Sequence, residues 1–277
     1  MKIGVMTHAT DQAIEPARLA VEAEERGFSS VFLTEHTHIP VRPFIRWWGG
    51  QPMPEEYKRL HDPIVALATA AAVTTRIRLG TGVLVLAQRE ALATAKQLAS
   101  LDRLSGGRLV LGVGYGWEAD ELVDHGIAWH QRRPALRESL AAIRTLWHDD
   151  ESSHTGDRIS FGPCWSYPKP VQTPPPVLIG ATGTDSTLLD IIHHADGWMP
   201  IEGTEPIHER WRRLRHLADD HGRNPDDLSL HVYASSGDAA ALDAHRATGA
   251  AEVIIAVTGT IDDVLRHLDR HARTIDT

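Results

Sequence analysis

Three ionisable side chains stand within four residues near the N-terminus: Glu35, His36 and His38. They lie at and just after the end of an apolar run, SSVFLTE, that is typical of a buried β-strand. An imidazole gains or loses a proton near neutral pH, and a carboxylate beside it can set its tautomer. His36 next to Glu35 could therefore transfer a proton in catalysis. Metal ligation by His36 and His38 is the alternative, although no other short motif supplies a third ligand.

Two glycine-rich stretches could bring the backbone close to a ligand. The first is Gly112–Gly116 (GVGYG), and the second is Gly180–Gly183 (GATG), with Ser186 in the helix that follows. Glycines let N–H groups approach an anion or a flat ring, and a helix N-terminus attracts negative charge. The structural alternatives are a tight turn relieved of crowding at the first stretch, and a helix capped by Asp185 at the second.

A strand–helix–strand unit positions the first glycine stretch. Ile77–Ala87 and Arg108–Val113 are apolar on both faces, as strands covered on two sides are. Between them, Glu90–Arg103 has the period of an amphipathic helix, and Gly106 and Gly107 end it. A helix that connects two such strands predicts a parallel, right-handed crossover.

The same alternation of strands and helices continues along the chain. Eight strands are predicted, at residues 2–7, 29–35, 77–87, 108–113, 176–181, 197–201, 228–234 and 252–258. They predict an α/β fold, a (β/α)8 TIM barrel, with residues 1–277 as a single domain. An irregular insertion, 39–61, follows the second strand, and an irregular excursion, 149–176, precedes the fifth. Reactive groups in such barrels follow the carboxyl ends of the strands.

The composition of the chain limits the kinds of partner and compartment that we expect for the protein. The net charge of −9 and the lack of a basic run argue against nucleic acid. No apolar run approaches the length of a membrane span, and a strand predicted from Lys2 leaves no room for a signal peptide. A single cysteine, Cys164, fits a reducing compartment, so we expect a cytoplasmic protein. The helix Pro63–Thr74 is almost wholly small and apolar, which predicts burial on more than one side and a homodimer formed through it.

The stretch LGTGVLVLAQREALATAKQLASLDRLSGGRLVLGVGYGW closely resembles the most characteristic segment of the luciferase-like monooxygenase family. Within that family it is most similar to oxidoreductases that use the deazaflavin coenzyme F420. The similarity extends to LTEH at the end of the second strand, to PKPVQ at residues 168–172 and to HADGWMP at residues 194–200.

The resemblance implies a set of site residues. A non-proline cis peptide between Gly82 and Val83 would form a backstop behind the flavin ring, and His36 with Glu35 would lie near the reacting ring edge. Further cofactor contacts are implied for Gly114, Tyr115, Gly116, Gly180, Ala181, Thr182, Gly183 and Ser186. The related sugar-phosphate dehydrogenases have a glutamate directly after Gly-x-Gly, where this chain has Trp117, so that activity is not expected.

The function implied is that of an F420-dependent oxidoreductase, which transfers hydride between the deazaflavin and a small organic substrate beneath the 39–61 insertion. Four cations of this insertion would hold the acidic tail of the cofactor: Arg42, Arg46, Lys58 and Arg59. The first alternative is a monooxygenase that uses reduced FMN and oxygen. A metal-dependent hydrolase built on His36 and His38 and a flavin-binding protein without turnover are the others.

Overall fold

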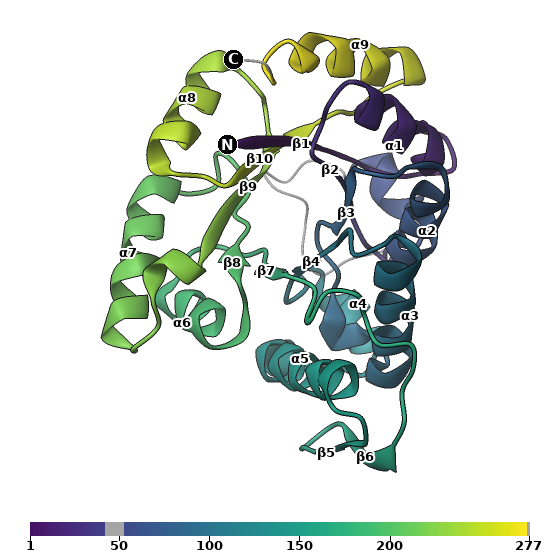
Figure 1. The fold of residues 1–277 in the computed structure, drawn as a ribbon, viewed down its shortest axis with the longest axis vertical. Coiled ribbons are helices and arrows are strands. Elements are labelled where there is room, and N and C mark those ends of the chain that lie inside the picture. The colour runs from purple at the N-terminus through teal and green to yellow at the C-terminus, as the bar shows by residue number, and fades with distance from the viewer. Residues whose placement is uncertain (42–52, 276–277) are drawn as a thin grey trace.

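Parallel strands close into a barrel in the computed structural model, which describes residues 1–41 and 53–275 (Figure 1). Around the ring, neighbouring strands follow the order β1-β10-β9-β8-β7-β4-β3-β2. The barrel strands are β1 (Lys2–Thr7), β2 (Ser30–Leu33), β3 (Arg78–Thr81), β4 (Leu109–Val113), β7 (Val177–Ile179), β8 (Gly197–Trp198), β9 (Ser229–Ser235) and β10 (Glu252–Ala256). The predicted (β/α)8 fold is confirmed, and the carboxyl ends of all these strands meet at one mouth.

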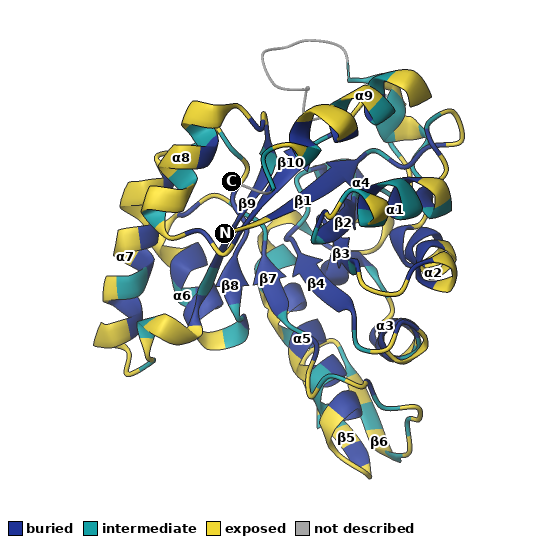
Figure 2. Ribbon diagram, turned by 45° about the horizontal axis from the view of Figure 1, so that its top comes forward, coloured by how far each residue is buried: buried dark blue, intermediate teal, exposed yellow. Residues whose placement is uncertain are grey.

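Helices surround the barrel, with buried inner faces and exposed outer faces (Figure 2). They are α1 (Pro16–Glu25), α2 (Pro63–Val73), α3 (Ala91–Leu104), α4 (Ala119–Asp124), α5 (Arg132–His148), α6 (Asp185–His194), α7 (Ile207–Asp220), α8 (Ala239–Thr248) and α9 (Ile261–Ala272). Side chains cap several of them, as when Asp62 accepts hydrogen bonds from Ile64 N and Val65 N at 2.9 and 3.0 Å. None of the helices in the described ranges combines the length and apolar character needed to cross a bilayer.

Apolar side chains pack on both sides of the barrel wall, because successive strand residues face opposite sides. The inner cluster consists of Met6, Phe32, Val110, Leu178, Met199, Tyr233 and Ile254. The larger outer cluster fills the space between strands and helices and includes Val5, Leu33 and Leu111. Gly80 on β3 is required by this packing, because a Cβ there would lie 2.3 Å from the ring of Phe32.

The third strand is shorter than predicted. Strand β3 ends at Thr81, the peptide between Gly82 and Val83 is cis, and Leu86–Gln88 forms a short 3-10 helix. The amide of Val85 donates to the Glu35 carboxylate at 2.6 Å instead of to a neighbouring strand. The apolar sequence continues to Ala87, but the regular strand ends at Thr81, so the predicted end of the third strand at Ala87 is wrong.

The excursion before the fifth barrel strand contains a hairpin that the sequence reading missed. Strands β5 (Ser152–Thr155) and β6 (Ser160–Cys164) pair antiparallel and lie at the outer end of α5 (Figure 1). Gly156 and Asp157 lie in the connecting turn, which is the one local signal for it. In the insertion after β2, Glu55–Lys58 forms a 3-10 helix, whereas Arg42, Arg46, Trp47 and Trp48 lie outside the described residues.

Helix α2 is buried on one face only within this chain. Ile64, Leu67 and Ala71 face the core, while Val65 and Val73 are 66% and 52% exposed. Within the described residues the second apolar face is left uncovered, so its burial against another subunit stays a prediction.

A buried carboxylate joins strands at the amino end of the barrel. Glu252 accepts hydrogen bonds from Ser29 and Ser30 on one oxygen, and from Arg78 (2.6 Å) and His231 (3.1 Å) on the other. Burial by itself would raise the pKa of Glu252, but the hydrogen bonds and the Arg78 charge outweigh it and lower the pKa to about 2.

Replacing Glu252 by Gln is expected to lower the free energy of unfolding by about 3 kcal/mol at pH 7. Because the folded pKa of about 2 lies below the ordinary value of 4.5, this stabilisation is complete above pH 4.5 and is lost as the pH falls toward 2. Urea unfolding of both proteins at pH 7 and pH 3 measures it, with the exposed Glu151→Gln as control. A difference that does not shrink at pH 3 contradicts the prediction.

Candidate active site

His36 and Glu121 form a hydrogen-bonded pair at the mouth of the barrel. His36 follows β2, Glu121 lies on α4, and His36 Nδ1 is 2.7 Å from Glu121 Oε2. Both side chains are buried, with 5% and 3% exposed. Because a carboxylate only accepts, Nδ1 carries the proton and Nε2 of a neutral ring is left free to accept one. The predicted pairing of His36 with Glu35 is wrong, since its carboxylate partner is Glu121.

Glu121 also holds the chain on either side of His36. Its Oε1 accepts hydrogen bonds from Thr37 N at 2.8 Å, Thr37 Oγ1 at 3.0 Å and Gln88 Nε2 at 3.1 Å. Burial opposes ionisation of this carboxyl group, but the hydrogen bonds from His36 and Thr37 outweigh burial and lower its pKa. Glu121 is therefore a carboxylate at neutral pH and keeps the His36 ring in one tautomer.

Glu35 turns away from His36 and binds the chain after β3. Its carboxylate accepts hydrogen bonds from Val85 N at 2.6 Å and from Arg89 Nε at 2.5 Å, and Arg89 also reaches Asp62 at 2.5 Å. Neighbouring residues of an extended chain point in opposite directions, so Glu35 and His36 do not face the same space. These contacts support a positioning role for Glu35, and its part in catalysis stays a prediction.

Aromatic rings surround His36. Its ring centroid lies 5.5 Å from that of Tyr57 and 5.3 Å from that of Trp117, while Tyr57 is 4.9 Å from His8. Burial lowers the pKa of His8, partly opposed by Glu56, so that this imidazole is neutral at pH 7. Burial also raises the pKa of Tyr57 to about 12, which keeps its hydroxyl protonated.

Several buried polar atoms at this mouth have no hydrogen-bond partner among the described residues, and they include His8 Nδ1, Thr34 Oγ1 and Tyr233 Oη. His8 and Thr34 each stand two residues beyond an inward-facing member of the inner cluster, Met6 and Phe32, and Tyr233 belongs to that cluster. Buried polar atoms are rarely left unpaired. Their grouping at the carboxyl ends of β1, β2 and β9 fits a polar ligand that supplies the missing partners.

Val83 stands between two of the predicted cofactor glycines. A Cβ on Gly114 would lie 2.5 Å from Val83 Cγ2, and one on Gly180 would lie 2.4 Å from Val83 Cγ1. Gly82 itself is covered by the Tyr233 ring, which a Cβ would meet at 2.4 Å. The structure therefore brings Gly82, Val83, Gly114 and Gly180 together, and the two outer glycines make room for the Val83 side chain.

The side chain of Tyr115 contacts Asp190 and Arg133. Its hydroxyl donates to Asp190 Oδ2 at 2.6 Å, and the Arg133 guanidinium lies 4.8 Å from the ring centroid. Gly116, which follows it, has φ +81°, a conformation that favours glycine. Contact between a cofactor and the backbone of Gly114–Gly116 stays a prediction.

In the second glycine stretch, a backbone N–H already binds a carboxylate of the same chain. Gly183 N donates to Glu205 Oε2 at 2.7 Å, and Thr184 accepts from Thr187 N as the cap of α6. The cap predicted at Asp185 is therefore wrong by one residue. Ala181 O accepts from Trp198 Nε1 at 2.9 Å, while Thr182 and Ser186 are exposed. Cofactor contacts at residues 180–186 stay a prediction.

The family model of luciferase-like monooxygenases matches residues 1–274. The chain belongs to this family. Membership confirms the resemblance found in the sequence and the expected class of enzyme, an oxidoreductase.

Similar proteins include one uncharacterized protein and two named enzymes. An uncharacterized protein of Mycobacterium tuberculosis is 42% identical over 237 residues, which cover 84% of each chain. The F420-dependent glucose-6-phosphate dehydrogenase of Nakamurella multipartita is 33% identical over 196 residues, 69% of this chain and 53% of the relative. The 5,10-methylenetetrahydromethanopterin reductase of Methanolobus tindarius is 29% identical over 277 residues, 98% of this chain and 75% of the relative.

Solved structures of this family confirm the fold. The monooxygenase RslO1 from Streptomyces bottropensis superposes with a TM-score of 0.81 at 23% identity, covering 99% of this chain and 98% of that one. The F420-dependent tetrahydromethanopterin reductase from Methanopyrus kandleri gives 0.66 at 20% identity, over 84% and 65% of the two chains.

His36 and His38, which follow β2, contact different carboxylates. His36 binds Glu121, whereas His38 Nε2 lies 3.0 Å from Asp124 Oδ2 at the surface. Across residues 1–41 and 53–275, no three His, Cys, Asp or Glu side chains are grouped so that they could hold a metal ion. Thr34 and Tyr233 were not singled out by the sequence, and only their position near strand ends could have indicated them.

Replacing Glu121 by Ala is expected to lower the free energy of unfolding by about 2–4 kcal/mol, because four buried or partly buried donors, on His36, Thr37 and Gln88, lose their acceptor. Urea unfolding measures this, and nitrogen NMR of the His36 ring should show that the proton is no longer held on Nδ1. Asp124→Ala, which removes one exposed contact on the same helix, should cost less than about 1 kcal/mol. Equal losses in the two variants would contradict a special role for Glu121.

Proposed function

We propose that the protein is an F420-dependent oxidoreductase that transfers hydride between the deazaflavin and a small organic substrate at the carboxyl-end mouth. The main support is the group of buried atoms on His8, Thr34 and Tyr233 that have no hydrogen-bond partner among the described residues at this mouth. F420 is favoured over FMN because a 33% identical relative is named as F420-dependent. The bound deazaflavin supplies the hydride chemistry at its ring.

The residues of this chain have separate tasks in the proposal. Val83, with Gly114 and Gly180 on either side, supports the flat face of the cofactor. His36 orients the substrate or exchanges a proton with it through Nε2, since Glu121 occupies Nδ1. The rings of Tyr57 and Trp117 exclude water on the side of His36. Trp117 stands where sugar-phosphate dehydrogenases of the family have glutamate, so we do not extend the glucose-6-phosphate activity to this chain.

Two of the four cations expected to hold an acidic cofactor tail already have partners. Lys58 Nζ lies 2.6 Å from Glu55, and Arg59 lies 3.0 Å from Asp11. Competition from these carboxylates weakens the argument for Lys58 and Arg59. The proposal for the tail now depends on Arg42 and Arg46.

We further propose that α2 forms the interface of a homodimer in the cytoplasm. Val65, Ala68, Ala72 and Val73 form an exposed apolar face on this helix, and Leu92 on α3 is 38% exposed. A second copy of the same face would remove this surface from water. The single cysteine, Cys164, remains the argument for a reducing compartment.

Oxidised F420 is expected to bind more tightly than FMN and to quench tryptophan fluorescence. Gly114→Ala should raise the F420 dissociation constant at least tenfold, because its Cβ would lie 2.5 Å from Val83 Cγ2 and displace that side chain. Gly162→Ala is the matched control, since a Cβ there meets nothing within 4 Å.

The same titration separates the alternatives. Tighter binding of FMN would favour the monooxygenase reading, and binding of neither cofactor would overturn the proposal. Incubating the reduced F420 complex with a panel of carbonyl and alkene substrates then tests turnover. F420 binding without any oxidation across the panel would leave a non-catalytic flavin-binding protein.

A Val65→Glu, Val73→Glu double variant is expected to shift the protein from dimer to monomer, because it would bury carboxylates in the proposed interface. Size-exclusion chromatography with light scattering measures the mass. Ile261→Glu, a substitution of an exposed isoleucine on α9, should leave the dimer intact. A monomeric wild-type protein at about 50 µM would overturn the interface.

A further inference from the structure

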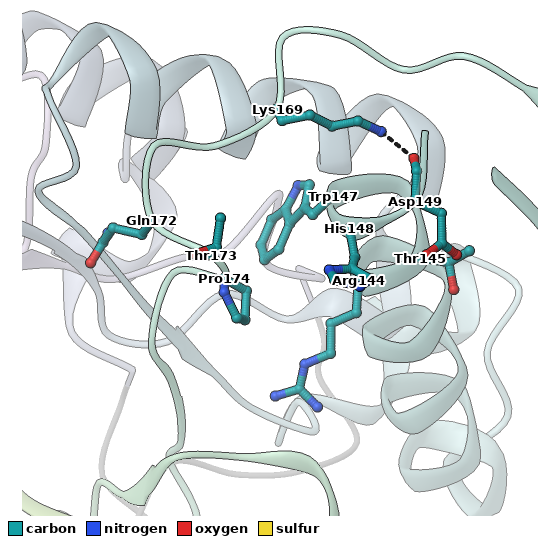
Figure 3. Close-up of a pocket in the computed structure, with 9 residues that line it drawn as sticks. All are labelled: Arg144, Thr145, Trp147, His148, Asp149, Lys169, Gln172, Thr173 and Pro174. Atoms are coloured by element: carbon teal, nitrogen blue, oxygen red, sulfur yellow. Dashed lines mark hydrogen bonds between the residues drawn. The ribbon is translucent and has the colours of Figure 1, made fainter. Parts of the chain in front are cut away.

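A cavity lies at the opposite end of the barrel from the candidate active site. It has a volume of about 480 Å³ and lies between the end of α5 and residues 169–174. Figure 3 shows Arg144, Trp147 and His148 on the α5 side, with Gln172, Thr173 and Pro174 across from them. Residue 174 precedes β7, and Gln172 contacts the first residue of β4, so this cavity adjoins the amino ends of the strands.

Arg144 is a partly buried cation without a matching anion. No hydrogen bond or ion pair joins its guanidinium to any other residue in the described ranges. The Asp196 carboxylate raises its pKa and the Arg223 guanidinium lowers it, so these two charges act in opposite directions. Burial lowers the pKa of Arg144, yet a guanidinium remains charged at neutral pH. A desolvated charge of this kind is stabilised by an anion that can reach it.

The wall opposite α5 is held in place before any ligand arrives. Asp102 accepts hydrogen bonds from Val171 N, Gln172 N and Gln172 Nε2 at 2.7, 3.0 and 2.7 Å. Lys169 Nζ donates to the carbonyls of Leu146 and Asp149 and so ties the segment to the end of α5. These residues belong to the PKPVQ stretch, which has no role in the proposed reaction. Because hydrogen bonds already hold this stretch in place, little ordering is needed when a ligand binds.

The chemistry of the lining selects one kind of ligand. The Trp147 ring and Pro174 offer apolar surface, and Trp147 Nε1 is already bonded to Ala95 O. Lys169 Nζ is bonded to two carbonyls, and His148 and Asp149 are exposed, so the partly buried guanidinium of Arg144 is the charge of the lining that a ligand inside the cavity would meet. The cavity volume is that of a small-molecule site.

We propose that this cavity binds a small organic carboxylate, with its flat apolar body against Trp147 and Pro174 and its carboxylate on the Arg144 guanidinium. The planar fork of arginine matches a carboxylate in two parallel hydrogen bonds. The site is separate from the mouth, so its occupation does not depend on the proposed redox function.

Calorimetric titration of the full-length protein with 1-naphthoate tests the proposal. Wild type should bind 1-naphthoate at least about tenfold more tightly than 1-naphthalenemethanol, which has the same body without the charge, and more tightly than acetate, which has the charge without the body. Arg144→Met, which keeps the length of the side chain, should weaken 1-naphthoate binding at least about tenfold. Arg212→Met, which removes an exposed arginine from a different cavity, should leave it unchanged.

Several outcomes would overturn the site. These are no binding of 1-naphthoate by wild type, equal binding of the neutral alcohol, or a loss of affinity in Arg212→Met that equals the loss in Arg144→Met. Should Arg144→Met fail to fold, Arg144→Lys and the wild-type comparison of acid with alcohol still decide the question.

Discussion

The mouth of the barrel depends on one buried carboxylate, that of Glu121. It receives donors from residues after β2, through His36 and Thr37, and from Gln88 after β3, while it stands itself after β4. A buried charge is tolerated only where hydrogen bonds replace the water it has lost. Three consecutive loops of the barrel therefore have to meet at this point, and their meeting determines which nitrogen of His36 is paired with Glu121.

A second constraint acts through packing. Val83 occupies space that side chains at residues 114 and 180 would otherwise fill, and the Tyr233 ring covers Gly82. The contact joins residues that directly follow β3, β4 and β7 to a side chain on β9. Because the interior of a protein is close-packed, a methyl group added at either outer glycine would move Val83. Charge at Glu121 and shape at Val83 together define the site.

The two ends of the barrel differ in how their polar groups are satisfied. At the amino end, each oxygen of Glu252 has two donors, which suits a role in stability. At the carboxyl end, His8, Thr34 and Tyr233 each present a buried atom with no hydrogen-bond partner in the described parts of the chain. This contrast follows the general rule that barrel enzymes place stability at one end and chemistry at the other. Arg144 departs from this pattern at the amino end, because its guanidinium lies beside a cavity without a hydrogen bond to any described residue.

Periodicity along the chain was enough to determine the barrel, because strands covered on both faces and amphipathic helices have different patterns that need no knowledge of distant contacts. It also placed His36 and the glycine stretches after strand ends, and the family resemblance predicted the cis peptide at Gly82-Val83 that the structure shows. It misplaced the end of the third strand and missed the β5–β6 hairpin, because both depend on which partner a backbone amide finds. Only the tertiary structure could decide that Glu121, 85 residues away, and not the adjacent Glu35, is the partner of His36. Side chains that are neighbours in an extended chain point apart, whereas loops distant in sequence converge when the barrel closes.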